Sequence, residues 1–233
     1  MTKLLRLLVL SGCAVITASL MGCAATSVPV AIDSVRSATI TLQPTGGIPV
    51  AVSRTGVGSA AFGLIGALVE QSANKDDRAI HKEKLQAALG DGLFDVANQT
   101  LKTILPKTME PKLITDAPRV SPILAYGPIW NAPTRTPKTT SDTSGGMTLE
   151  YGFVMISSYK TMLTHLASVS FGVALIDDKS GKVLGKARDY GTMSIPVDYD
   201  DPDYAVKVKQ VFDALTVRTV EDTIKKLFFP NNR

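Results

Sequence analysis

The chain has 233 residues, a formal net charge of +4 and two cysteines. This length suffices for one domain with a sizeable hydrophobic core. Acidic and basic residues are interspersed, which excludes the clustered basic surface of a nucleic-acid-binding protein and predicts no nucleic-acid partner. Both cysteines, Cys13 and Cys23, precede residue 24, so thiol catalysis and a disulfide are excluded for the rest of the chain.

Residues 1–22 have the pattern of a bacterial secretion signal. Lys3 and Arg6 are the only charged residues before residue 33, and the apolar run after them is too short to span a bilayer comfortably. The run ends in Leu20-Met21-Gly22-Cys23, which resembles a bacterial lipobox. That resemblance implies cleavage before Cys23 and a lipid, including palmitate, on that residue. The alternatives are an ordinary secretion signal with an incidental cysteine, or an uncleaved anchor.

A second cysteine has the same local pattern. Cleavage before Cys13 would leave only Leu7–Leu10 as an uninterrupted apolar run, which is shorter than a secretion signal needs. Cys23 is therefore the predicted lipidation site and the predicted attachment to the membrane. Ala24 and Ala25 follow it, without an aspartate at the second mature position. By analogy with the best-known lipoprotein sorting rule, this predicts the outer membrane, with the protein facing the periplasm.

The first mature segment predicts a tether and two short strands. Residues 23–34 are small and mostly uncharged, so we expect a lipidated tether there and a folded domain over 35–233. Residues 36–43 alternate between apolar and polar side chains, as a half-buried strand does. Residues 44–47 form a predicted turn, and 48–52 form a second short strand.

Three helices are predicted next. The segment 56–69 is uncharged and rich in glycine and alanine, and it predicts a helix over 59–72. Three interpretations stay open for this segment: a buried core helix, a partner or homo-oligomer interface formed by its small residues, and direct membrane contact. Apolar residues at helical spacing predict further helices over 75–89 and 93–105, and Pro106 ends the last one.

Residues 106–146 are predicted to form a long proline-rich and polar loop excursion. Seven of the thirteen prolines lie within 106–137. Tyr126, Ile129 and Trp130 also lie there, and exposed aromatic residues in loops are candidate anchors for a partner. These three residues are therefore the predicted partner contacts. The alternative is a loop held onto the core by the same side chains.

The clearest strand pattern begins at His165, where larger side chains alternate with small ones for about a dozen positions. A turn follows, and residues 183–189 are its predicted hairpin partner, while 149–157 form a strand that pairs ahead of it. A last helix is predicted after Asp201, its expected N-cap, with a buried stripe that reaches Phe228. This order of elements predicts the α/β class: a single-domain sandwich of a mixed, largely antiparallel sheet with helices packed on it and a C-terminal helix.

The sequence contains no group of residues with the composition and spacing of a catalytic site. His81 and His165 lie far apart and have no cysteine partners, which makes a zinc site improbable. The aspartates between 198 and 203 lack the pattern of a calcium loop, so a solvated loop before a helix is favoured over a cation site. Gly56-Val57-Gly58 formally fits a relaxed dinucleotide motif, but packing glycines are favoured. We therefore predict no catalytic residue, no metal, no cofactor and no enzyme activity.

A resemblance between the C-terminal part of the chain and a known family implies a function. The turn Asp177-Asp178-Lys179-Ser180-Gly181-Lys182-Val183 joins two strands before a final helix, and this arrangement over 147–228 resembles lipoproteins related to the TolB amino-terminal domain. These are curli-secretion lipoproteins and activators of peptidoglycan synthases. The resemblance implies a lipid-tethered, non-catalytic module that binds or assembles proteins of the cell envelope. The alternative is an oligomeric secretion or pore component that uses residues 56–69.

Overall fold

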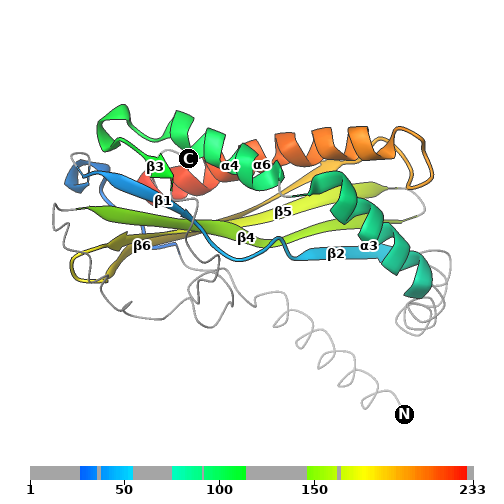
Figure 1. The fold of residues 1–233 in the computed structure, drawn as a ribbon, viewed down its shortest axis with the longest axis horizontal. Coiled ribbons are helices and arrows are strands. Elements are labelled where there is room, and N and C mark those ends of the chain that lie inside the picture. The colour runs from blue at the N-terminus through cyan, green and yellow to red at the C-terminus, as the bar shows by residue number, and fades with distance from the viewer. Residues whose placement is uncertain are drawn as a thin grey trace, which may run out of the picture.

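Three long antiparallel strands form the centre of the fold (Figure 1). β4 (Met147–Lys160), β5 (His165–Asp177) and β6 (Val183–Ser194) pair in chain order. The turn between β5 and β6 contains Gly181, whose φ of 67° suits a residue without a Cβ. The predicted strand from His165 and its hairpin partner are confirmed, and β4 and β6 are longer than predicted.

The computed structural model describes residues 27–35, 38–54, 75–90, 92–113, 146–161 and 164–229. Several predictions concern residues outside these ranges. They are the secretion signal with Cys23, the helix over 59–72, and the partner contacts Tyr126, Ile129 and Trp130.

Three short strands extend the sheet by parallel pairing. β1 (Ile40–Pro44) and β2 (Val50–Arg54) pair with the first and second halves of β4, and β3 (Lys112–Leu113) pairs with β1. The six-stranded sheet is therefore mixed and open, with antiparallel pairing among its longest strands. β1 and β2 lie slightly later in the chain than predicted.

The turn after β1 explains part of this shift. The backbone N–H of Thr45 still donates to the carbonyl of Tyr151 on β4, at 2.8 Å, so pairing continues past the predicted turn start at Pro44. The chain then turns at Gly46, which has a φ of 70°.

Helices cover one face of the sheet (Figure 1). They are α3 (Lys75–Leu89), α4 (Gly92–Ile104) and α6 (Tyr204–Phe228), with short 3-10 turns η1 (Ile32–Ser34) and η2 (Lys107–Met109). α6 contacts β5, β6, α3 and α4. The predicted helices over 75–89 and 93–105 and the predicted fold class are confirmed. Within the described residues, no helix is both long and apolar enough to cross a membrane.

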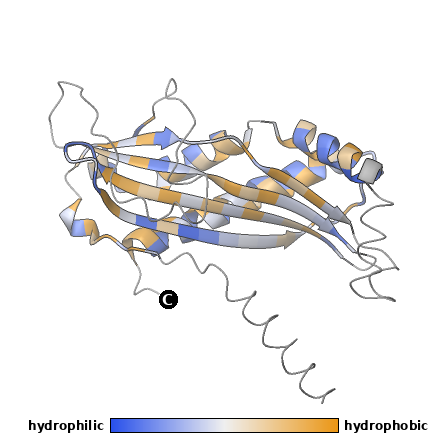
Figure 2. Ribbon diagram, turned by 90° about the horizontal axis from the view of Figure 1, so that it is seen from below, coloured by the Kyte–Doolittle hydropathy of each residue, from blue (hydrophilic) through white to orange (hydrophobic). Residues whose placement is uncertain are grey.

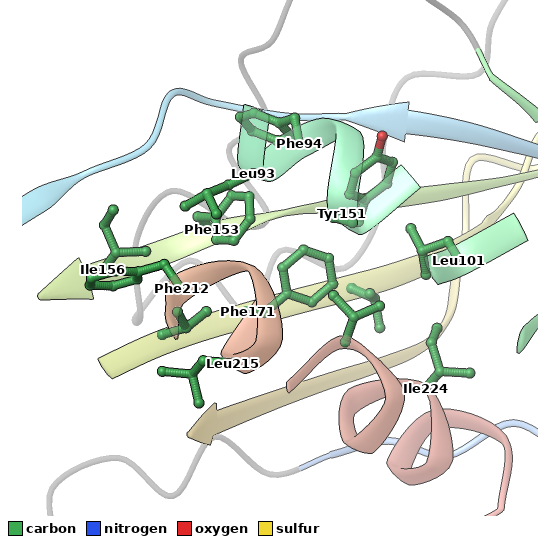
Figure 3. Packing of buried hydrophobic residues seen from close by; sticks show 14 of the residues in the cluster. Leu93, Phe94, Leu101, Tyr151, Phe153, Ile156, Phe171, Phe212, Leu215 and Ile224 are labelled. Atoms are coloured by element: carbon green, nitrogen blue, oxygen red, sulfur yellow. The ribbon is translucent and has the colours of Figure 1, made fainter. Parts of the chain in front are cut away.

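Aromatic side chains from three elements meet at the centre of the core (Figure 3). Phe94 of α4 packs edge-on against Phe153 of β4, with ring centroids 5.1 Å apart, and Phe153 packs edge-on against Phe171 of β5 at 5.4 Å. Edge-to-face pairs of this kind add to the stabilisation from apolar burial. Apolar and polar residues vary along both strands and helices (Figure 2), as expected for elements with one buried side.

α6 begins at Tyr204, two residues later than the predicted N-cap at Asp201 implies. Its N-cap is Asp203, and Asp201 instead closes a preceding turn: its carbonyl accepts from Tyr204 N at 3.0 Å and its carboxylate accepts from Asp203 N at 2.8 Å. The aspartate therefore accepts a backbone N–H through its carboxylate, as predicted, but it lies two residues before the observed N-cap.

The helix-facing side of β6 is lined by small residues that permit close packing. At Gly191, an added Cβ would lie 2.8 Å from Leu215 Cδ1 of α6. At Gly185 it would lie 2.1 Å from Val30 Cγ2 and 2.8 Å from the Val28 carbonyl oxygen. The chain before β1 thus packs directly on β6, beside the end of α6.

Residues 27–35 are held on the domain by backbone hydrogen bonds. Val28 forms an antiparallel bridge with Lys186, and Val30 N donates to the carbonyl of Leu227 at 2.8 Å. Val30 and Val35 are buried in the core. The later part of the predicted tether over 23–34 therefore lies against the fold.

We expect Gly185→Ala to lower the free energy of unfolding by about 1–3 kcal/mol, because the added methyl group overpacks the site. Hydrogen exchange should show lost protection at Val28 and Val30, while β5 keeps its protection. Chemical denaturation measures the stability. Gly47→Ala is the matched control: nothing lies within 4 Å of an added Cβ there, so we expect a change within about 0.5 kcal/mol. Equal effects of both substitutions would contradict the close packing at Gly185.

Candidate functional site

A buried polar network lies where β4 ends, β5 begins and the chain leaves β6. A β-bulge between Phe153 and Met155 makes it possible, because it changes which residues of β4 face the helices. Odd-numbered residues face the core as far as Phe153, and even-numbered ones do so from Ile156 onward. Ser158 is therefore directed into the core, on the same side as His165.

Three side chains form a hydrogen-bonded chain in this network. His165 Nδ1 lies 2.8 Å from the carbonyl oxygen of Val197, so this nitrogen carries the proton of the neutral ring and donates it. His165 Nε2 is then the acceptor for Ser158 Oγ at 2.8 Å. Ser158 Oγ in turn lies 2.9 Å from the hydroxyl of Tyr199, which donates to it. This chain fixes the loop after β6 to the sheet.

The electrostatics keep the His165 ring neutral near pH 7. Burial lowers the pKa of His165 below its ordinary value of 6.5, and the positive charge of Lys160 acts in the same direction. The Val197 carbonyl and the negative charge of Asp198 oppose this shift less strongly than burial favours it. Lys160 and Asp198 form an ion pair, and the hydrogen bond from Lys160 lowers the pKa of Asp198.

Tyr199 is the centre of the site. The ring of His81 from α3 stacks on it, with centroids 3.9 Å apart and planes 8° apart. The ring of His165 lies 4.6 Å from it, and Lys160 Nζ lies 5.8 Å from the centre of the Tyr199 ring. The two histidines that the sequence places far apart are therefore brought together around one tyrosine.

The contact between Ser158 and His165 has the separation of a nucleophile and its base. The Ser158 side chain is, however, 0% exposed, and its hydroxyl is already engaged by both Tyr199 and His165. A substrate carbonyl would have no path to this oxygen in the described arrangement. The geometry suits a structural polar network, in which each hydrogen-bonded side chain restrains the next.

The acidic loop beside this network faces lysines. The pairs are Asp198 with Lys160, Asp200 with Lys84, and Asp201 and Asp203 with Lys207. Across the part of the chain that the structure describes, no three His, Cys, Asp or Glu side chains are grouped to hold a metal ion. The predicted solvated loop before a helix agrees with the observed place of these aspartates.

An open depression of about 470 Å³ lies between α3 and the start of α6. Its lining includes Ala87 and Ala88 of α3, Tyr199 of the network, and Tyr204 and Ala205 of α6. The hydroxyl of Tyr204 is buried and forms no hydrogen bond within the described residues, and burial raises its pKa well above the ordinary value. The depression is shallow and largely apolar.

Sequence reasoning identified His81 and His165 but not their partners Ser158, Lys160 and Tyr199. Ser158 and Lys160 were missed because the bulge in β4 leaves no distinct mark in the alternation of the strand. Cys23, Tyr126, Ile129 and Trp130, which the sequence singled out for lipidation or partner contact, lie outside the described residues.

Comparisons with known proteins give structural similarities only. No protein-family model matches the sequence, and no curated protein matches it. The chain is similar to a PelC dodecamer subunit from Paraburkholderia phytofirmans, with 10% identity and a TM-score of 0.33 over 87% of this chain and 95% of the other. It is similar to lipoprotein GNA1162 from Neisseria meningitidis, with 11% identity and a TM-score of 0.27 over 76% and 97%. At these values, the function proposed below rests on the sequence and geometry of this chain alone.

We expect the stability of the protein to fall as the pH drops below about 6.5, partly through His165. Its pKa is lowered in the folded state, so below 6.5 the unfolded chain binds more protons than the folded protein, and its contribution is complete only above that pH. His165→Gln should flatten the dependence of unfolding free energy on pH as the pH falls below about 6.5.

Chemical denaturation at several pH values measures this slope. His81 is kept in both proteins, and Asp198 titrates at lower pH because its pKa is lowered from 3.8, so the difference in slope isolates His165. An unchanged slope in the variant would contradict the buried neutral ring. At high pH, the difference in unfolding free energy between the wild type and His165→Gln gives the packing cost of the substitution.

Proposed function

We propose that this protein is a lipid-anchored, non-catalytic binding or assembly module of the bacterial cell envelope. The observation that carries the proposal is the run from Leu20 to Cys23, preceded by a short cationic and apolar segment. A diacylated cysteine would attach the domain to the outer membrane, facing the periplasm. The domain would then act on proteins within reach of that membrane.

Two features of the described residues support the non-catalytic part of the proposal. Ser158 and His165 form a buried pair whose hydroxyl has no open side. The four aspartates of the loop before α6 face lysines and thereby compensate charge locally. Both arrangements stabilise the fold, and neither presents a reactive group to a substrate.

A matched pair of cysteine variants tests the anchor. Cys23→Ser should abolish lipidation and membrane sedimentation of the mature protein, because the lipid would have no thiol to join. Cys13→Ser is the control and should be processed like the wild type, since Cys13 lies within the segment that is removed. Mass spectrometry of the mature chain and inhibition of signal peptidase II provide the measurements. Normal processing of Cys23→Ser would refute the lipid anchor.

A second candidate is an oligomeric secretion or pore component. The observation that favours it is the uncharged glycine- and alanine-rich segment 56–69, since small residues let helices from two subunits approach closely. If this candidate is right, the lipidated protein in detergent should elute as a defined multimer when size-exclusion is coupled to light scattering. Substituting leucine for Gly63 and Gly66 should reduce the mass toward that of a monomer. A strictly monomeric wild type would exclude this candidate.

A further inference from the structure

The chain enters the fold at the edge of β6 with a fixed direction. Val28 N donates to the carbonyl of Lys186 at 2.8 Å, and Lys186 N donates back to the carbonyl of Val28 at 2.9 Å. Paired bonds of this kind make the segment antiparallel to β6. Ser27, which precedes Val28, therefore lies on the side of Arg188 and Tyr190.

The chain between this bridge and the proposed anchor is short. Four residues separate Cys23 from Val28, and the five Cα-to-Cα steps between them span at most about 18 Å when fully extended. Tyr190 lies four residues beyond Lys186, or about 13 Å along the strand. The lipid attachment point is therefore confined to the neighbourhood of the β6 edge, because it can lie no farther than about 18 Å from Val28.

The side chains at this edge suit a phospholipid surface. Val28, Lys186, Arg188 and Tyr190 share the side of the sheet that faces away from the helices, since alternate residues of a strand share a face. Tyr190 is 59% exposed and Val28 is 45% exposed. Tyr190 is the strongest of these observations, since tyrosine is enriched at the boundary between headgroups and water, whereas Lys186 is half-buried and Arg188 Nε already donates to Ser170 Oγ at 2.9 Å.

The same edge is protected against addition of a strand from another protein. The carboxylate of Asp189 accepts from the backbone N–H of Tyr190 at 2.7 Å, so this outward donor is already used. Asp189 also pairs with Lys226 of α6 at 2.7 Å, which holds the carboxylate in place and offsets its charge. A charged residue at a strand edge is a common means of preventing edge pairing. A bilayer, which needs no backbone partner, fits this edge better than a strand does.

We propose that the anchor-side edge, formed by Val28, Lys186, Arg188 and Tyr190, faces the headgroup region of the membrane that holds the lipid on Cys23. This inference rests on the proposed lipidation. It orients the domain: the sheet face at β6 lies toward the bilayer and the helix layer lies away from it. Val206 of α6 is on the far side, since it is 62% exposed on the helix layer.

Fluorescence quenching in vesicles tests this orientation. Thr192→Cys and Val206→Cys each introduce one label site into the mature lipoprotein, because the Cys23 thiol is consumed by the lipid. Thr192 is exposed, lies on the same face as Tyr190 and leaves Tyr190 intact. Each protein is labelled with an environment-sensitive dye and placed in phosphatidylethanolamine–phosphatidylglycerol vesicles that carry nitroxide headgroups. We expect several-fold stronger quenching at position 192 than at 206.

A linker insertion provides the second measurement. About 20 glycine and serine residues placed between Thr26 and Ser27 add a root-mean-square reach of about 25 Å, which frees the domain from the surface. We expect quenching at position 192 to fall to the level at 206. Quenching that survives the insertion would also support the proposal and would assign the contact to the edge side chains themselves.

The outcomes separate the two proposals. Lipid found on Cys23 by mass spectrometry, with equal quenching at both positions or stronger quenching at 206, overturns the orientation and leaves the anchor standing. Absence of the lipid overturns both the anchor and the orientation. Denaturation curves of the two labelled proteins confirm that each is folded.

Discussion

The close approach of α6 to β6 is the contact on which the rest of the structure depends. β6 presents Gly185, Ala187 and Gly191 toward the helix layer, and a Cβ added at Gly191 would meet Leu215 and Thr219 of α6 at under 3 Å. This proximity buries Leu215 and Leu227 of α6 completely. Burial of each such side chain is worth about 1.5–3 kcal/mol, which is a large share of the net stability of a domain.

The second constraint is the bulge in β4. Before it, Tyr151 and Phe153 contribute to the aromatic core with α4, and after it Ser158 faces the same layer. One inserted residue thus divides β4 into an apolar half and a polar half that share one side of the sheet. The polar half can be buried because His165 and Tyr199 satisfy the Ser158 hydroxyl, and a buried hydroxyl without partners would cost about 1–3 kcal/mol.

The sequence predicted the elements better than their connections. The period of two from His165 and the helical spacing over 75–89 and 93–105 are strong patterns, and the structure confirms them. In β5 both faces are buried, and the period arises because the larger side chains face the helix layer while the small ones face the other way. The parallel pairing of β1 and β2 with β4 was not predicted, since pairing partners depend on contacts between distant residues. The network around Tyr199 was missed for the same reason.

Contacts between distant residues were also missed for the N-terminal segment. Small uncharged residues over 23–34 predict a tether by composition, and composition does not record that Val30 fills the space above Gly185. A glycine on an edge strand is visible in the sequence, but its role requires knowing which chain approaches it. The Gly185–Val30 contact is a packing fact that only the assembled sheet reveals.

The two ends of α6 therefore make different contacts. Its C-terminal end holds the incoming chain through the carbonyl of Leu227 and the packing of Val30, while its N-terminal end lies beside Tyr199 and the open depression. With 25 residues, α6 separates these two regions by about 37 Å. If the β6 side of the domain faces the bilayer, α6 lies on the opposite side of the sheet, and a partner bound at the depression would be held away from the membrane surface.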